Sequence, residues 1–457
     1  MIEKELKIKE KRFTISFFHY LPSISIPNRL MLAKKLYEEG NSNEALKFID
    51  EFDKKKGLSL EDQLSSHLLR INLLLKLNRF EDAIKFAKQA YQKSQKTGKN
   101  LQSLDILIYL AWALQGRWKL NESYNVIKQC ENLIKSLIEE SPTEILVRKS
   151  ILIRLEGEIY RFKGDINQCL KCEKQSLILA EKLNDKGLIV ACLYNLSMIY
   201  KEISDYSSAL ECIDRSLEFF DDKSLDIDLK AYTLNDAVEI LTSKGELERA
   251  QKYLQRLKKL NNEEDSKDVN TIYCLSKALT LKATLQIPNL RKAEEVLKQI
   301  LNGEIFYFEY RLKILIHLCD LLLIELRMTN SIELLNEIQS YINQIINISK
   351  NQQSYWMLTE IYLFRAKLKL IIFKFEEAHR LLTKAYDVAE KSGQTRLAKR
   401  IMNEQFELSN NFMKWEKLKA SKAKISERMD LACIDEQIEI LLKKRNYLRR
   451  LMLNPNH

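Results

Sequence analysis

A small residue recurs along this chain about every 40 residues, and this repeat restricts the possible folds more than any other feature. The series reads Ala45, Ala83, Ser123, Cys169, Ala209, Ala250, Ala293 and Ala378, with Ser331 filling the double-length gap before the last member. Every member is Ala, Ser or Cys. A fixed period of this length is the signature of a protein built from stacked supersecondary units.

A second column of residues lies twelve positions before the first. It reads Ala33, Ile71, Ala111, Gly157, Ser197, Val238, Leu281, Cys319 and Ala366, and six of these nine are small. Two antiparallel helices approach closely only where neither carries a bulky side chain. The two columns therefore predict one tight helix pair per repeat, with the least regular register near residues 275–340.

Large apolar residues flank the small ones at helical spacing, and short polar turns separate the helices. Around Ala209 the apolar positions are Leu196, Ile199, Tyr200, Leu210, Ile213 and Leu217. The turns read Glu39-Gly40-Asn41, Lys163-Gly164-Asp165, Ile203-Ser204-Asp205 and Lys244-Gly245-Glu246. A Gly or Ser in such a turn ends one helix and helps to cap the next.

The composition supports a helical fold. The chain has 457 residues but only 10 Gly and 5 Pro, where average usage would give roughly 32 and 23. Hairpins and phosphate-binding loops need glycine, so sheet folds are disfavoured. We predict an all-α protein: an α-solenoid of about nine antiparallel helix pairs with C-terminal capping and tail helices.

These columns resemble the tetratricopeptide repeat (TPR). The family pattern of a small residue, an aromatic or Leu, a Gly turn, an aromatic and Ala reads here as Gly157, Tyr160, Gly164, Ile166, Cys169 and again as Ser197, Tyr200, Ser204, Tyr206, Ala209. The resemblance covers roughly residues 28–390. The period is nearer 40 than the family's 34, and the proline after the second helix is absent. The chain therefore resembles the long-period subclass of kinesin-light-chain-like adaptors and archaeal TPR proteins.

Four segments follow from this pattern. They are an N-terminal extension at 1–27, the TPR solenoid at 28–393, a capping helix at 394–416 and a basic amphipathic helical tail at 417–457. A solenoid must end in a helix with a polar outer side, because its last core face would otherwise be exposed.

The resemblance implies that the first helix of each repeat lines a concave groove that binds a partner. The positions carried over are Asn72, Tyr109, Trp112, Arg154, Glu158, Arg161, Tyr194, Asn195, Met198, Lys201, Asn235 and Glu239. In the long-period subclass an Asn at the position of Asn195 holds the backbone of an extended peptide, and an amide offers both a donor and an acceptor for this role. The alternative is that these residues are solvated or serve contacts within the solenoid.

No motif argues for an enzyme, a metal or a cofactor. Cys169 and Cys172 form a lone CxxC without a second ligand pair, so we expect them to be core residues. The five His include no close ligand pair, and no two glycines are near enough for a P-loop. The eight scattered Cys fit a reducing compartment, and we expect a cytoplasmic protein without a transmembrane segment.

Part of the net charge of +11 is local to the C-terminus, where residues 413–457 hold eleven Lys/Arg and six acids. The near-balanced body does not favour a specific nucleic-acid partner. In the tail, Leu431, Ile434, Ile438, Leu441, Arg445, Leu448 and Met452 follow a heptad spacing. Three alternatives stay open: a helix folded back on the solenoid, a coiled coil that pairs two chains through 431–452, or a basic helix that meets an acidic surface.

The sequence thus predicts a non-enzymatic protein–protein interaction scaffold or adaptor that binds a peptide or helical segment in its groove. The alternative is a ligand-sensing signalling or transcription-regulator TPR module. Neither the partner nor the pathway can be read from the residues.

Overall fold

The computed structural model describes residues 30–38, 42–77, 79–95, 100–117, 119–137, 141–163, 165–222, 225–263, 266–303, 308–351, 354–392 and 394–443. Every regular element within these ranges is a helix, which confirms the predicted all-α class. The extension at 1–27, the turn at 39–41, Gly164, Arg445, Leu448 and Met452 lie outside the described residues.

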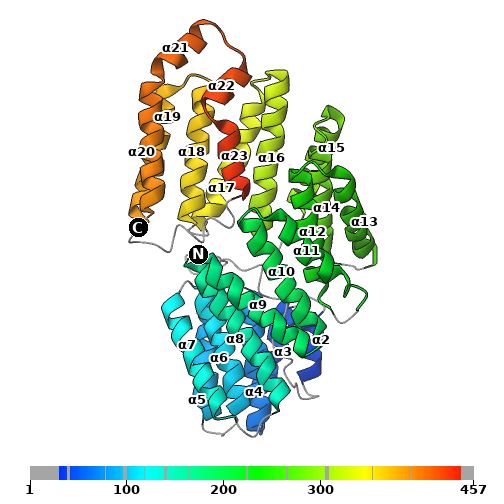
Figure 1. Cartoon of the computed structure of the whole chain (residues 1–457). Helices are drawn as coiled ribbons and strands as arrows, with labels where there is room; N and C mark the ends of the chain where they lie inside the picture. The colour runs from blue at the N-terminus through cyan, green and yellow to red at the C-terminus, as the bar shows by residue number, and fades with distance from the viewer. Residues whose placement is uncertain are drawn as a thin grey trace. The chain divides into compact units, whose positions relative to one another are not determined.

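The first nine helix pairs follow one another along the chain (Figure 1). Their bounds are α2 (Met31–Glu38), α3 (Ser42–Asp53), α4 (Leu60–Lys76), α5 (Phe80–Gln95), α6 (Asn100–Gly116), α7 (Leu120–Lys135), α8 (Pro142–Phe162), α9 (Ile166–Lys182), α10 (Lys186–Glu202), α11 (Tyr206–Leu217), α12 (Ile227–Ser243), α13 (Leu247–Glu263), α14 (Lys267–Lys282), α15 (Ile287–Asn302), α16 (Phe308–Thr329), α17 (Leu334–Asn351), α18 (Tyr355–Ile371) and α19 (Phe375–Lys391). Four more helices follow: α20 (Thr395–Asn410), α21 (Phe412–Ala420), α22 (Ile425–Leu431) and α23 (Ile434–Lys443).

The chain forms two compact units, and we call the one that ends at Leu229 unit 1 and the one that begins at Lys230 unit 2. In both units most consecutive helices are in direct contact, as the prediction of stacked pairs requires. In unit 1, α6 also lies against α4 and α8, so that the first helices of successive pairs form one row. We call the even-numbered helices α4–α18 the inner helices and their odd-numbered partners the outer helices.

The small residues lie where the helices of a pair cross. All members of the first column except Ser331 are fully buried. The Ser123 hydroxyl of α7 donates a hydrogen bond of 2.8 Å to the Ala111 carbonyl of α6, which joins the two columns directly. At Gly157 of α8, an added Cβ would lie 2.9 Å from Cβ of Cys172 on α9, closer than real side chains come.

The register prediction for one repeat is wrong. Ser331 was placed in the first column, but it precedes α17, whose buried positions include Ile338, Ile342 and Ile345. Most turns within pairs have three residues, whereas those between α14 and α15 and between α16 and α17 have four. The longer turns contain Leu285 (φ 54°) and Asn330 (φ 56°) in the left-handed region. Ser331 lies in the second of these turns, because α16 continues to Thr329.

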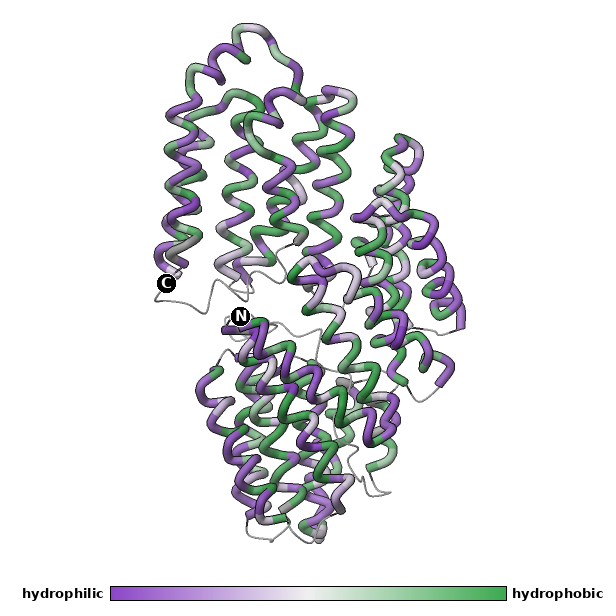
Figure 2. Tube along the Cα trace, viewed as in Figure 1, coloured by the Kyte–Doolittle hydropathy of each residue, from purple (hydrophilic) through white to green (hydrophobic). Residues whose placement is uncertain are grey.

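The inner and outer helices bury different amounts of surface. Outer helix α19 buries a single stripe of Ala378, Leu382, Ala385 and Ala389, which is the pattern of a helix with one wet face. Inner helix α18 buries 14 of its 17 residues. Figure 2 shows the contrast on α13, an outer helix whose tube is largely hydrophilic. Helix α18 is thus covered on more than one side.

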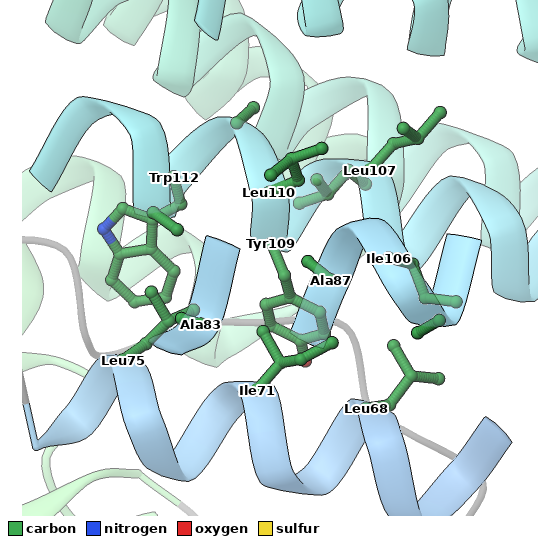
Figure 3. Packing of buried hydrophobic residues seen from close by; sticks show 14 of the residues in the cluster. Leu68, Ile71, Leu75, Ala83, Ala87, Ile106, Leu107, Tyr109, Leu110 and Trp112 are labelled. Atoms are coloured by element: carbon green, nitrogen blue, oxygen red, sulfur yellow. The ribbon is translucent and has the colours of Figure 1, made fainter. Parts of the chain in front are cut away.

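Figure 3 shows how small outer-helix residues admit large inner ones in unit 1. Ala83 and Ala87 of α5 lie among Ile71 and Leu75 of α4 and Tyr109 of α6, and all five side chains are buried. The core of unit 1 is continuous from α2 to α8 through such contacts.

The C-terminal helices of unit 2 turn back on the repeats. Helix α20 packs on α19, and Trp415 of α21 meets Phe373 and Phe375 at ring-centroid distances of 6.5 and 6.3 Å. Helices α22 and α23 then lie against inner helices α16 and α18 (Figure 1). For residues 425–443, the structure therefore has the first of the three alternatives for the tail, a helix folded back on the solenoid.

Introducing a large side chain at the α8–α9 crossing should test the close approach. We expect Gly157→Leu to lower the free energy of unfolding by about 3 kcal/mol, because the new side chain must displace Cys172. Hydrogen exchange should increase first in α8 and α9, since repeats are stabilised chiefly by their neighbours. Lys149→Leu, at an exposed position of the same helix, should change stability by no more than about 0.5 kcal/mol. Equal effects of the two variants would contradict a tight crossing.

Candidate functional site

All twelve predicted groove residues lie on inner helices. They are Asn72 on α4; Tyr109 and Trp112 on α6; Arg154, Glu158 and Arg161 on α8; Tyr194, Asn195, Met198 and Lys201 on α10; and Asn235 and Glu239 on α12. Ten belong to unit 1, and the last two belong to unit 2. Nine are buried, whereas Met198, Lys201 and Glu239 are half-buried. Their role in partner binding remains a prediction.

Charged side chains of unit 1 converge where α8, α9 and α10 meet. The Arg161 guanidinium donates to a Glu202 oxygen at 3.0 Å and to a Glu158 oxygen at 3.2 Å. A second arginine, Arg154, places Nε 3.9 Å from a carboxylate oxygen of Glu173. We call these five residues the buried charge cluster, because each of their side chains is no more than 4% exposed.

The helical period explains why these groups meet. Arg154, Glu158 and Arg161 follow one another at spacings of four and three, so they share one face of α8. Helix α9 brings Glu173 to this face because Gly157 has no side chain to hold α9 away; an added Cβ there would lie 3.9 Å from the Glu173 carboxylate. Glu202 reaches the cluster from the last residue of α10.

The cluster contains three carboxylates and two guanidinium groups, so its own charges would balance with one carboxylate protonated. Burial raises the pKa of Glu173 to about 7, although Arg154 partly opposes this shift. Burial alone would lower the pKa of Arg161, but the charges of Glu158 and Glu202 raise it above its usual value. Breaking such a buried pair typically costs about 3–5 kcal/mol, because an uncompensated charge is left inside.

Asn195 takes part in the same network. Its amide nitrogen donates to the Glu173 carboxylate at 3.3 Å, and the residue is only 2% exposed. The resemblance assigns the Asn195 amide donor to the backbone of a bound peptide, but in the structure it donates to the carboxylate of Glu173 in the same chain. The network can hold α8, α9 and α10 in fixed positions, which would align the half-buried Met198 and Lys201 on the same inner helix.

The predicted aromatic positions belong to the core. Tyr109 and Trp112 are buried on α6, and Figure 3 shows both rings directed toward α4. In unit 2, Asn235 accepts a hydrogen bond of 2.9 Å from Ser276 and donates one of 3.0 Å to Glu239, which also pairs with Lys313. Polar contacts between inner helices are therefore common to both units.

The sequence reasoning missed Glu173 and Glu202. Glu173 lies in the buried stripe of an outer helix, with Cys169, Ser176, Leu177 and Ala180 around it. An acid at an apolar position of such a stripe is a signal that could have been noticed, because acids are rarely buried without a partner. Glu202 ends its helix and looks like an ordinary surface acid in the sequence.

The remaining candidates show no chemistry of a reactive site. Cys169 and Cys172 are buried, and burial raises the pKa of Cys172 to about 11, where the inert thiol predominates at neutral pH. Among the described residues, no group of three or more His, Cys, Asp or Glu is arranged to hold a metal ion. None of the described helices combines the length and apolar character needed to span a membrane.

A second site with clear geometry is the surface of α16 and α18 in unit 2, which we call the inner face of unit 2. Helices α22 and α23 cover it. Gln437 of α23 donates to the Glu360 carboxylate at 2.8 Å and accepts from Arg400 at 2.7 Å. Arg400 also donates to Glu360 at 2.7 Å, which closes a polar triangle beneath the covering helix. None of these three residues was predicted as a site residue.

Comparison with known proteins gives a fold-level likeness. No family model and no curated protein matches the sequence. Similar solved structures include the apo form of the quorum sensor NprR from B. thuringiensis, at 15% identity over 79% of this chain and 97% of that chain, with a TM-score of 0.49. A Rap protein complexed with competence and sporulation factor is 12% identical over 81% of this chain and 98% of that chain, with a TM-score of 0.46. A STAND protein with a tetratricopeptide repeat sensor from Pyrococcus horikoshii is 15% identical over 80% of this chain and 55% of that chain, with a TM-score of 0.47.

At such identities the likeness concerns the fold alone. The likeness to kinesin-light-chain-like adaptors remains a prediction.

The buried charge cluster should make stability depend on pH. The pKa of Glu173 is about 7 in the folded chain, against 4.5 for an ordinary glutamate. Between these values the folded state retains a proton that the unfolded state has lost, so stability should fall as pH rises from about 5 to about 8, by up to about 1.4 kcal/mol per unit.

We expect Glu173→Gln to remove this part of the slope in urea titrations at a series of pH values. Glu211→Gln, an exposed change on α11, should retain the slope of the unmodified chain. A Glu173→Gln variant with an unchanged pH dependence would show that Glu173 is ionised throughout.

Proposed function

We propose that this protein is a non-enzymatic interaction scaffold whose inner helices bind a peptide or helical segment of a partner protein. The observation that carries the proposal is the position of α22 and α23 on α16 and α18. A helical segment that follows the repeats along the chain is held on an inner face by buried apolar side chains and specific polar contacts. The surface thus already binds a helix within one chain.

The physical basis is pre-organisation. In unit 1, for example, α6 is held by its outer partner α7 and by the inner helices α4 and α8, so the side chains that meet a partner are ordered before it arrives. Binding then requires mainly the ordering of the incoming segment. Solenoids provide extended surfaces of this kind because each repeat contributes one helix to the same face.

For unit 1 the proposed partner-binding face is that of α4, α6, α8 and α10. Met198 and Lys201 are its half-buried predicted members, and the buried charge cluster lies beneath them as a support for α8 and α10. We propose no cofactor or metal for this function. The unpaired state of the cysteines is compatible with the reducing cytoplasm that we propose as its location.

Site-specific photo-crosslinking tests this assignment. A benzoylphenylalanine at position 198, on the inner helix α10, should capture a discrete set of proteins in native lysate. The same residue at position 178, where Ile178 is 51% exposed on outer helix α9, should not capture that set. Lys201→Glu should reduce capture at position 198 by several-fold, since it reverses a charge at the same site.

Capture of the same proteins from both positions would show that partner binding does not use the inner helices. Absence of any crosslink at position 198, under conditions where position 178 gives background crosslinks, would also contradict the assignment.

A further inference from the structure

The inner face of unit 2 is covered by a helix pair with an apolar side and an acidic side. The buried apolar residues are Ile425 and Met429 of α22 and Ile434, Ile438 and Leu441 of α23. In α23 they stand at i, i+4 and i+7, the anchor spacing of an amphipathic helix that lies in a groove. The acids Asp430, Asp435 and Glu436 are exposed positions of the same pair.

Polar contacts fix the direction and register of the pair. Arg327, near the end of α16, donates to Asp430 and to Asp435, each at 2.7 Å. The Ile425 amide donates to the Asn330 side chain at 3.0 Å, so the start of α22 is bound at the turn after α16. Arg428 donates to the Ile371 carbonyl at the end of α18 at 3.2 Å.

The most specific contact lies at the centre of the face. Gln437 is 1% exposed, and its amide group satisfies both Glu360, which is fully buried, and Arg400. Such a contact discriminates strongly, because an unmatched side chain would leave buried polar atoms without a partner, at about 1–3 kcal/mol. The two ion pairs of Arg327 are mostly exposed on the acid side and are worth at most about 1 kcal/mol each.

The covering pair is held by this face more than by its own stability. Helix α22 has 7 residues and α23 has 10, and isolated helices of that length are not stable in water. Left-handed residues precede both helices: Lys422 (φ 52°) before α22 and Cys433 (φ 50°) before α23. The pair is therefore a short, jointed segment whose helical order depends on docking.

We infer that the inner face of unit 2 is an exchangeable site that binds an acidic amphipathic helix of a partner protein in place of α22–α23. The inference rests on the proposed scaffold function and specifies its ligand. The chemistry of the resident pair defines the ligand: apolar residues at i, i+4 and i+7, an acid at i+1 for Arg327, and an amide at i+3 for Glu360 and Arg400. The basic side chain of Arg327 adds a modest preference for an acidic helix over a neutral one.

The covalent link between α22–α23 and the repeats determines how strongly the resident pair competes with a free helix. A segment linked to its own site has an effective concentration on the order of millimolar, so the resident pair should exclude a free helix of equal intrinsic affinity. Opening without replacement would expose the apolar surface of α16 and α18 to water. The face should therefore stay covered until a better or more abundant helix arrives.

A fluorescent peptide of residues 421–443 provides the probe, added to the full-length protein and followed by anisotropy. Ile438→Asp in the chain should weaken the resident helix without changing the face, and we expect it to tighten peptide binding at least tenfold relative to the unmodified chain. Glu436→Gln, at an exposed position of α23, should bind the peptide as weakly as the unmodified chain does.

Changes in the peptide test the ligand chemistry against the Ile438→Asp protein. A Gln437→Ala peptide should bind about tenfold more weakly, because Glu360 and Arg400 lose their matched partner. An Asp435→Asn peptide should lose no more than about threefold, since its ion pair is exposed. An Ile438→Asp peptide should not bind.

A second variant distinguishes release of the resident pair from misfolding of the Ile438→Asp chain. Asp430→Arg combined with Asp435→Arg places two positive charges next to Arg327 at exposed positions, so it should loosen the resident pair while the circular dichroism of the repeats is kept. Peptide binding that is no tighter in either variant than in the unmodified chain would overturn the inference.

Two further outcomes would also overturn it. Equal affinity of the native and Ile438→Asp peptides would show that the peptide does not bind in the geometry of the docked α23. A concentration-dependent dimer in size-exclusion chromatography with light scattering, formed by exchange of residues 421–443 between chains, would assign the face to a second copy instead of a partner. Crosslinking at position 198 tests partner binding by unit 1, so the proposed scaffold function is tested independently of helix exchange in unit 2.

Discussion

The structure depends on the close approach of two helices at a small residue. Without a bulky side chain at Gly157 or Ala209, the outer helix comes near enough for its stripe to bury large neighbours, and the same contact repeats along the chain. Burial of apolar surface then provides most of the stability. One geometric requirement, satisfied about every 40 residues, replaces the single central core of an ordinary domain.

This requirement explains what could be predicted from the residues alone. Small size and helical spacing are local properties, so the all-α class and the nine pairs were accessible, including the crossing at Ser123 and Ala111. The register failed at Ser331, because α16 continues to Thr329 and leaves Ser331 in the turn before α17, and composition does not mark this later helix end. The environment of the groove residues was harder to predict, because whether a polar residue faces solvent or a neighbouring helix depends on helices that come later in the chain.

Buried charge is the feature that sequence patterns described least well. Arg154 and Arg161 were predicted as groove residues, but their partners Glu173 and Glu202 lie on other helices and were not predicted. The polar triangle of Glu360, Arg400 and Gln437 has the same character in unit 2. The first network joins α8, α9 and α10, and the second joins α18, α20 and α23. Matched donors and acceptors give these helices a fixed spacing where apolar contacts alone would permit sliding.

The junction between α22 and α23 has a practical consequence. Cys433 is the exposed cysteine of the described chain, whereas Cys274 is half-buried and the remaining cysteines that the structure describes are buried. A maleimide dye would therefore attach mainly at the joint of the covering pair. The natural sequence thus carries its own spectroscopic reporter, and single-molecule lifetimes of the docked and undocked tail could be measured without engineering any residue.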